Sequence, residues 1–409
     1  MARIVLGSIG LSKKYQEVNY FWPEENKAYR TKYFLEAVVN LFQPDKYYVF
    51  CTPQILKWGV INELKNCLGD VVKEVPIPEG RSEEELWQIF DICVAQVAEG
   101  DQIILDVTHG FRSLPMLIFV VAAYLRQMKH VVLERVVYGA YEAKDENYNA
   151  PVFDLTLMVE LMDWFHGLDS FSRHGDAGLL KELMARAHDK GRLYGSGEEG
   201  PKLLKKAARR LDQLSLALHL SRPLEAIKVA NQLVKTLDGM EEEVARWAKP
   251  LQGVIGQLRW EVASLVCSEP HKLSKEVLKS QAALMKYCIE KGLYVQALLL
   301  IPEWIISLVM FLRGNTDNVI NDDRRKETRC LLNAFLYDDF SEVDQELCQW
   351  FLELPSRKDI VFNWESVTTR NDLAHCGFRK HSIKARRTKD TIKKLYNNLT
   401  DLLYLLEEE

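Results

Sequence analysis

The spacing of apolar residues changes near Leu157, and this change constrains the fold more than any other feature of the 409-residue chain. Before it, short apolar runs alternate with segments whose apolar residues recur every three or four positions. After it, only the helical spacing remains. Alternating strands and helices favour a mainly parallel sheet covered by helices on both faces, whereas a continuous helical period favours packed helices. The sequence therefore predicts an α/β domain followed by an all-α region.

Within the first 156 residues, the pattern is typical of a Rossmann-like fold. Apolar runs predict strands over 3–6, 47–51, 71–77, 103–105 and 131–138, and residues 152–155 are either a last strand or the run into a helix. Helical spacing predicts helices over 29–42, 55–68, 82–96 and 115–128. Ser82 and Glu85 form a capping box that marks the start of the third helix. In such sheets, ligands bind beyond the carboxyl ends of the strands.

Two polar turns follow strands of this expected sheet. The first contains Gly7, Ser8 and Gly10, and the second runs from Asp106 to Ser113 with the sequence DVTHGFRS. A strand that leads through a glycine-containing turn into a helix presents backbone N–H groups that can bind an anion. If the first and fourth strands are neighbours, both turns face one cleft. The side chains expected there are those of Ser8, Thr108, His109, Arg112 and Ser113.

The alternative for both turns is an ordinary strand-to-helix connection of an α/β domain. A dinucleotide cofactor is disfavoured, because the chain has neither a full GxGxxG fingerprint nor an acidic residue at the end of the second strand. A nucleotide-cofactor oxidoreductase is therefore the remaining alternative only if the chain belongs to no family with these turns.

Composition excludes several broad classes. A net charge of −5 and a pI near 6.1 argue against a chain-wide polyanion binder, although a local basic patch remains possible. The eight cysteines are scattered among apolar residues without a CxxC pair, which indicates reduced core cysteines in a cytoplasmic protein and disfavours a zinc site. We expect no signal peptide, because the N-terminus lacks a long apolar run, and no membrane span, because no stretch reaches about 18 apolar residues.

The segment from Trp364 to Gly377 reads WESVTTRNDLAHCG and fits a helix that stops at Gly377. Asn371 and His375 are four residues apart and share a face. Arg370 lies about 140° from His375 around an ideal helix, but its long side chain can reach the same cleft.

Histidine can act as general acid or base near neutral pH, and a neighbouring arginine can stabilise the charge that develops on a phosphate. Such a pair without a carboxylate cluster suits metal-independent RNA cleavage, in which the ribose 2′-hydroxyl is the nucleophile. The basic residues that follow suit the RNA backbone: Arg379, Lys380, His381, Lys384, Arg386 and Arg387. The alternative is a helix-capping histidine with surface arginines.

Taken together, these residues resemble the CRISPR-associated CARF–HEPN ribonucleases of type III systems. Residues 370–375, RNDLAH, match the R-x4-6-H motif of HEPN nucleases. Residues 106–115 resemble the D-x-T-H-G-F-x-S-L-P segment of one CARF subfamily, and 138–140 are similar to a segment found there. Residues 291–297, followed by Glu303, resemble the first helix of HEPN domains in this group. The middle of the chain, from about 166 to 270, matches in helical character only.

The resemblance implies a CARF domain over 1–156, a helical connecting region over 157–272 and a HEPN domain over 273–409. The CARF domain would bind a cyclic oligoadenylate, with four adenylates expected and six as the rival, through Gly7, Ser8, Gly10, Thr108, His109, Gly110, Arg112 and Ser113. A homodimer, or a higher oligomer, would then join two HEPN domains into one cleft. There Arg370, Asn371 and His375 of each copy would cut single-stranded RNA without metal or cofactor, leaving a 2′,3′-cyclic phosphate.

Two alternatives remain open within the family. The chain could be a non-enzymatic sensor that binds the cyclic oligoadenylate and relays the signal to a partner. It could also degrade the activator in its CARF domain, where Ser8, Thr108 and His109 could support cleavage.

Overall fold

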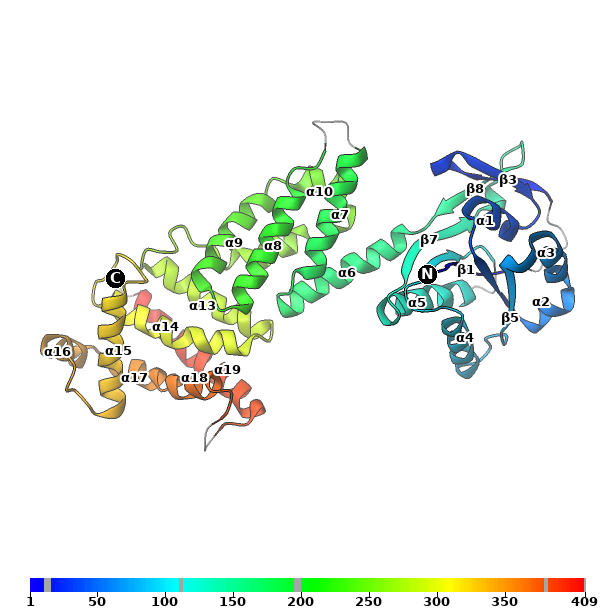
Figure 1. Cartoon of the computed structure of the whole chain (residues 1–409). Helices are drawn as coiled ribbons and strands as arrows, with labels where there is room; N and C mark the ends of the chain where they lie inside the picture. Colours follow the sequence, from blue (N-terminus) through cyan, green and yellow to red (C-terminus); the bar gives the residue numbers. More distant parts are fainter. Residues whose placement is uncertain (11–15, 110–112, 195–199, 379–381, 408–409) are drawn as a thin grey trace. The chain divides into compact units, whose positions relative to one another are not determined.

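The computed structural model describes residues 1–10, 16–109, 113–194, 200–378 and 382–407. The chain forms two compact units, Met1–Met162 and Asp163–Glu409, and Figure 1 colours them from blue to cyan and from green to red. Each unit has a fold class of its own, mixed α/β in the first and helical in the second.

The first unit is built on one eight-stranded sheet with the order β3-β2-β8-β7-β6-β1-β4-β5. Its strands are β1 (Arg3–Ser8), β2 (Val18–Trp22), β3 (Lys27–Thr31), β4 (Lys46–Cys51), β5 (Val72–Pro76), β6 (Gln102–Asp106), β7 (Val132–Gly139) and β8 (Asn149–Asp154). The five neighbours β5, β4, β1, β6 and β7 are all parallel. The predicted Rossmann-like arrangement is therefore confirmed.

Helices cover both faces of this sheet. On one face lie α1 (Phe34–Phe42), α2 (Pro53–Trp58) and α3 (Val60–Leu68), and on the other lie α4 (Glu83–Ala95) and α5 (Ser113–Met128). Successive side chains of a strand point to opposite faces, so each strand supplies both cores. In β1, Val5 packs with α1 to α3, whereas Ile4 and Leu6 pack with α4 and α5.

The prediction of a helix over 29–42 is wrong in its first part. Residues Lys27–Thr31 form β3, which pairs antiparallel with β2, and α1 begins only at Phe34. Burial in β2 alternates, with Val18, Tyr20 and Trp22 inside, which is the period of a half-buried strand. The sheet therefore carries a hairpin that joins it through parallel pairing of β2 with β8.

Two helix boundaries follow from local chemistry. The predicted helix over 55–68 is divided at Gly59, whose φ of +76° belongs to the left-handed region that glycine adopts without strain. The predicted capping box is confirmed at α4, where the Ser82 hydroxyl accepts a hydrogen bond from the Glu85 N–H at 3.2 Å.

The second unit is all-helical. Its helices are α6 (Leu157–His174), which begins in the first unit, α7 (Gly178–Tyr194), α8 (Leu204–His219), α9 (Pro223–Leu237), α10 (Glu241–Trp247), α11 (Lys249–Gln252), α12 (Ile255–Ala263), α13 (Lys275–Glu290), α14 (Tyr294–Leu312), α15 (Asp322–Tyr337), α16 (Gln345–Glu353), α17 (Arg357–Trp364), α18 (Ser366–Ala374) and α19 (Ala385–Asp401). One hydrophobic core runs from Trp164 to Leu406. A functional division of these helices at 272/273 stays a prediction.

Helix α14 is the central apolar helix of this core. By length and composition it is the one described helix that could cross a membrane, with a mean hydropathy of 2.1 over its most apolar window. Gln296 and Glu303 interrupt its apolar residues, so this helix does not contradict the expectation that no stretch reaches about 18 apolar residues, and the absence of a membrane span stays a prediction. Two thirds of that window is buried in the fold, against α13, α15, α18 and α19 among others, and burial accounts for the composition.

A buried ion pair ties three helices of the second unit together. Lys291, which follows α13, binds the carboxylate of Glu261 on α12 at 2.8 Å and also donates to the backbone carbonyl of Ser172 on α6. The Ser172 hydroxyl donates to the same carboxylate at 2.9 Å. The side chains of Lys291 and Glu261 are only 8% and 11% exposed, so each charge depends on the other for compensation.

All eight cysteines are unpaired, but only half of them fit the expectation of core cysteines. Cys51, Cys93, Cys267 and Cys288 are buried, whereas Cys67 and Cys376 are exposed. Burial raises the pKa of the Cys93 and Cys288 thiols to about 12, so these two stay protonated and unreactive at neutral pH.

Candidate functional site

The two polar turns meet at the carboxyl edge of the first sheet. Strand β1 pairs in parallel with β6, so Ser8 at the end of β1 lies beside the turn that follows Asp106. The Ser8 hydroxyl donates a hydrogen bond to the backbone carbonyl of His109. The first and fourth predicted strands are therefore neighbours, which was the condition for the two turns to meet, and the structure brings Ser8, Thr108 and His109 together.

The Asp106 carboxylate fixes the start of this turn through two hydrogen bonds. It accepts a hydrogen bond from the Tyr47 hydroxyl at 2.6 Å and another from the Thr108 N–H at 2.9 Å. The Thr108 hydroxyl in turn accepts from the Gly139 N–H at the end of β7, at 2.8 Å. Hydrogen bonds from residues of β4 and β7 thus fix residues 106–108 at the end of β6, and this part of the turn is ordered without a ligand.

Burial controls the protonation of this cluster. It raises the pKa of the Tyr47 hydroxyl and of the Asp106 carboxyl above their ordinary values. Burial lowers the pKa of the His109 ring, and the nearby Asp106 carboxylate opposes that change. A neutral imidazole is therefore favoured at His109, and it can exchange hydrogen bonds with a ligand.

Position 7 is occupied by glycine because the neighbouring Tyr47 and Asp106 leave no space for a side chain. A Cβ at this position would stand 2.4 Å from the Tyr47 hydroxyl oxygen and 2.9 Å from the Asp106 Cβ. Close packing against these two side chains thus accounts for the glycine, while its contact with a ligand stays a prediction. Gly10 is half-buried after Ile9.

The remaining residues predicted to contact the ligand are only partly described. Gly110 and Arg112 lie outside the described residues. Ser113 is the first residue of α5, but its side chain is not among those described. Sequence reasoning missed Tyr47, and the one available signal was a polar hydroxyl within the otherwise apolar run 47–51.

The contribution of the hydrogen bond from Tyr47 to Asp106 to the free energy of unfolding should depend on pH. Because burial raises the pKa of Asp106, the stability that this group contributes is present in acid and is lost as pH rises through its folded pKa. Tyr47→Phe removes a donor to the charged carboxylate. We expect it to lower the free energy of unfolding by about 1.5–3 kcal/mol at neutral pH and by less near pH 4, where protonation weakens the bond.

Urea unfolding at both pH values measures this difference. Tyr48→Phe is the matched control, because Tyr48 is the next residue of β4 and its hydroxyl makes no hydrogen bond with the described residues. An equal loss for Tyr47→Phe at both pH values would contradict the assignment of the charge to Asp106.

The second predicted site lies at the end of α18. The predicted helix over 364–376 is two helices, because Trp364 closes α17 and α18 begins at Ser366. His375 is the C-cap of α18, and Cys376 follows with a φ of +53°. The N–H of Cys376 binds the Leu373 carbonyl at 2.9 Å, and that of Gly377 binds the Asp372 carbonyl at 3.0 Å.

This pattern of bonds is a Schellman motif in which Cys376, and not Gly377, occupies the C′ position. The motif ends the helix directly after His375 and directs the chain away. His375 therefore stands at the exposed end of the helix, with its N–H bound to the Asn371 carbonyl at 3.2 Å.

Arg370 and Asn371 are half-buried and His375 is exposed. Among the described residues, none forms a hydrogen bond or an ion pair with these three side chains. The side chains predicted to be catalytic are thus left available. The backbone links Asn371 to His375, but the structure assigns no contact between the Arg370 and His375 side chains.

Asp372 positions this helix end. It is buried, and its carboxylate accepts a hydrogen bond from the Ile383 N–H at 3.1 Å, just before α19 begins. Its second carboxylate oxygen is buried without a partner among the described residues. Sequence reasoning missed this positioning role, since an aspartate inside a polar helix gives no signal of burial.

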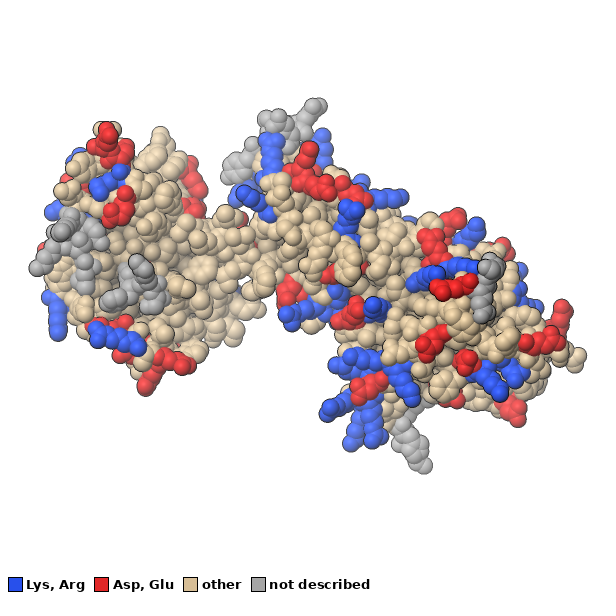
Figure 2. All heavy atoms as spheres, turned by 180° about the vertical axis from the view of Figure 1, so that it is seen from behind, with Lys and Arg blue, Asp and Glu red and all other residues tan. Residues whose placement is uncertain are grey.

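A positive surface begins directly after this site. Lys384 is the N-cap of α19, and Arg386, Arg387 and Lys389 follow on its first two turns, all exposed. Figure 2 shows Lys and Arg side chains gathered over the beginning of α19. The predicted basic residues 379–381 lie outside the described residues. Within the described ranges, no cluster of three His, Cys, Asp or Glu side chains could hold a metal ion.

Comparisons with known proteins give one family match in the first unit and another that lies almost wholly in the second. Residues 4–150 match the CARF domain of the CRISPR system endoribonuclease Csx1, and residues 160–262 match the second domain of the CRISPR-associated protein MJ1674. The chain is 34% identical to MJ1674 of Methanocaldococcus jannaschii over 111 residues, which are 26% of this chain and 18% of that protein. It thus matches less than a fifth of that relative's length.

Among solved structures, Enterococcus italicus Csm6 bound to cyclic hexa-2′-fluoro-hexa-dAMP is similar at 11% identity and a TM-score of 0.42, with 99% of this chain and 94% of that chain covered. The family matches support a CRISPR-associated protein with an N-terminal CARF domain. The connecting region, which sequence patterns described only as helical, has a family match of its own.

Proposed function

We propose that this CARF protein is a cyclic-oligoadenylate-activated endoribonuclease that cuts single-stranded RNA in type III CRISPR antiviral defence, in the cytoplasm. One observation carries the proposal: the half-buried Arg370 and Asn371 of α18 and the exposed His375 at its C-cap have no side-chain partner among the described residues. The activator is cyclic tetra-adenylate. It binds at the carboxyl edge of the first sheet, near Ser8, Thr108 and His109, and no metal or cofactor takes part.

The proposed reaction is an attack by the ribose 2′-hydroxyl on the adjacent phosphate. His375 of one protomer takes the proton of the 2′-hydroxyl, and the partner's His375 donates a proton to the leaving 5′-oxygen. Arg370 stabilises the negative charge that develops on the phosphate oxygens. The bond from phosphorus to the 5′-oxygen breaks, so the products are a 2′,3′-cyclic phosphate and a 5′-hydroxyl. The exposed cations of α19 would hold the RNA backbone near this site.

An exposed apolar stripe on α5 supports a homodimer. Met116, Val120, Tyr124 and Met128 recur at every fourth position, and all four are exposed. The Phe90 ring on α4 lies 5.0 Å from Tyr124 and joins the stripe to the exposed Trp87, 5.7 Å away. A continuous exposed apolar patch of this kind marks an interaction surface.

We expect Val120→Glu to convert the dimer into a monomer, because a charge in the centre of a buried apolar patch has no partner there. RNA cleavage should then fall at least tenfold at low protein concentration, since two protomers complete one cleft. Analytical ultracentrifugation and a cleavage assay measure the two effects. Leu216→Glu on α8 is the control, because Leu216 is as exposed as Val120 but lies outside the patch. A dimeric Val120→Glu variant would exclude this patch as the interface.

The central experiment combines a binding screen with a cleavage assay. Purified protein is titrated with cyclic oligoadenylates of three to six adenylates, and the tightest binder is added to labelled single-stranded RNA in EDTA. We expect the ring of four adenylates to bind best and to stimulate cleavage that leaves 2′,3′-cyclic phosphate ends. Tight binding without cleavage of any RNA would favour the non-enzymatic sensor.

A second candidate function rests on the first site. Ser8 and the neutral-favoured His109 lie together at the sheet edge, an arrangement that could support slow cleavage of the activator itself. Incubating labelled activator with wild type and with His109→Ala separates this candidate from the ribonuclease. Linear adenylate fragments formed by wild type alone would support it.

A further inference from the structure

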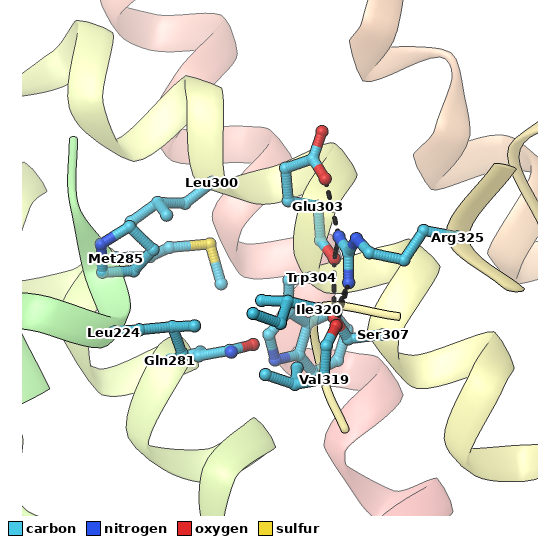
Figure 3. A pocket seen from close by; sticks show the side chains of 11 residues that line it. Leu224, Gln281, Met285, Leu300, Glu303, Trp304, Ser307, Val319, Ile320 and Arg325 are labelled. Atoms are coloured by element: carbon cyan, nitrogen blue, oxygen red, sulfur yellow. Dashed lines mark hydrogen bonds and ion pairs between the residues drawn. The ribbon is translucent and has the colours of Figure 1, made fainter. Parts of the chain in front are cut away.

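A pocket of about 190 Å³ opens in the second unit, between the start of α9, helices α13 and α14, and the segment that leads into α15. Its walls are apolar side chains: Leu224, Met285, Leu300, Trp304, Val319 and Ile320. Two uncharged polar residues, Gln281 and Ser307, and the ion pair of Glu303 with Arg325 stand among them (Figure 3). This pocket could not be predicted from the sequence, because its lining residues come from segments up to about 100 residues apart.

The size of the pocket limits the ligand to one small ring system. An engineered apolar cavity of about 150 Å³ takes up benzene, whereas sites for drug-sized molecules span about 300–1,000 Å³. A whole dinucleotide or a folded peptide therefore does not fit. A single nucleobase does, and the apolar side chains of the lining can pack against it.

Gln281 on α13 gives the pocket its specificity. The residue is only 8% exposed, and its amide forms no hydrogen bond with the described residues. Figure 3 shows this side chain directed into the space between Leu224 and Val319. Neither amide atom is among the fully buried atoms that lack a partner, so the amide faces the open pocket, where a ligand can hydrogen-bond to it in place of water.

A primary amide presents a donor and an acceptor side by side. Adenine carries the complementary pair, an exocyclic amino group next to a ring nitrogen, and glutamine binds it with two hydrogen bonds. On its N7 edge, guanine presents two adjacent acceptors, which arginine matches better than glutamine does.

Arg325, the arginine of the pocket, is already engaged. It binds the Glu303 carboxylate at 2.6 Å, the Ser307 hydroxyl at 2.9 Å and the Val319 carbonyl at 2.9 Å (Figure 3). The guanidinium of this arginine is therefore occupied by protein acceptors and is not available to bind guanine.

The charges at the mouth suit a nucleotide. Arg329 also approaches the Glu303 carboxylate, at 3.6 Å, so two guanidinium groups share one carboxylate. Glu303 and Arg329 are both about half-exposed, and the excess positive charge faces solvent. A phosphate attached to a bound nucleoside would be attracted to this charge, which lies next to the lining residue Glu303.

We propose that this pocket binds the adenine base of a nucleotide and that Gln281 recognises the base. The ligand chemistry is shared by an adenosine within single-stranded RNA and by free adenosine monophosphate. The RNA source rests on the proposed function and would give the ribonuclease a preference for adenosine-containing substrates.

The test measures binding by the full chain, with His375→Ala as background so that the RNA stays intact. Fluorescence anisotropy compares labelled oligoadenylate with labelled oligouridylate, and a separate titration uses adenosine monophosphate. We expect oligoadenylate to bind about tenfold more tightly than oligouridylate. Gln281→Leu should reduce this preference to less than twofold, whereas Gln252→Leu, at an exposed position of α11, should keep it.

A second variant protects the test against a folding defect. Leu300→Trp fills the pocket from the opposite wall and leaves Gln281 in place, so it should abolish the preference with unchanged helical content. A preference that survives both variants would overturn the proposal, and so would a wild type that binds neither adenosine monophosphate nor oligoadenylate selectively.

The result separates this inference from the ribonuclease. Adenosine monophosphate binding that depends on Gln281, in a protein that cuts no RNA, would keep the pocket and reject the ribonuclease. RNA cleavage without any adenine preference would keep the ribonuclease and reject the adenine pocket.

Discussion

Replacing His375 with alanine should reduce activator-stimulated RNA cleavage by about 10²–10⁴-fold, the usual contribution of a general acid or base. The change should leave binding of cyclic oligoadenylate intact, because that ligand is proposed to bind in the other compact unit. His375 is exposed at the C-cap of α18, so truncating its side chain removes no packing. Initial cleavage rates with saturating activator measure the loss.

The chain offers a matched control for this experiment. His174 is also an exposed histidine at the end of a helix, the last residue of α6. His174→Ala should cut RNA at the wild-type rate. A His375→Ala variant that cuts as fast as wild type would remove His375 from the mechanism.

Breaking the buried ion pair should have the largest effect on stability. Lys291→Met leaves the Glu261 carboxylate buried at a side-chain exposure of 11% and without its counterion. We expect the free energy of unfolding of the second unit to fall by about 3–5 kcal/mol. Urea denaturation followed by helical circular dichroism measures this loss.

Two further variants identify its cause. Lys286→Met breaks an exposed pair with Glu290 on the same helix, and it should cost less than about 0.5 kcal/mol. The double variant Lys291→Met, Glu261→Met should recover much of the loss, because apolar side chains can replace a buried pair. Equal costs for Lys291→Met and Lys286→Met would mean that burial adds nothing to this ion pair.

The parallel part of the sheet was predictable because its strands are buried on both faces. Runs such as residues 103–105 carry continuous apolar sequence, and such runs end at recognisable turns. The hairpin of β2 and β3 was not predictable in the same way. In β3 only Thr31 is fully buried, so apolar spacing did not mark it as a strand.

Contacts between distant segments also escaped sequence reasoning. Both polar turns were identified from their composition, but the bond from Tyr47 to Asp106 joins residues 59 positions apart through the strand order. The Arg370–His375 spacing was visible as a motif. Where its helix begins was not, because Trp364 fits the apolar face of either helix and only packing assigns it to α17.

Close packing around Gly7 and Gly139, next to the first site, limits which substitutions such a domain can accept as its sequence diverges. Any larger residue at Gly7 collides with Tyr47 and Asp106, and any larger residue at Gly139 collides with the Phe34 ring. Relatives that evolve to sense a different signalling molecule must therefore vary the rim of the turns, because the layer below admits almost no substitution. Ligand specificity would then depend on residues at the rim of the turns, and the ability to fold would depend on the packed residues next to them.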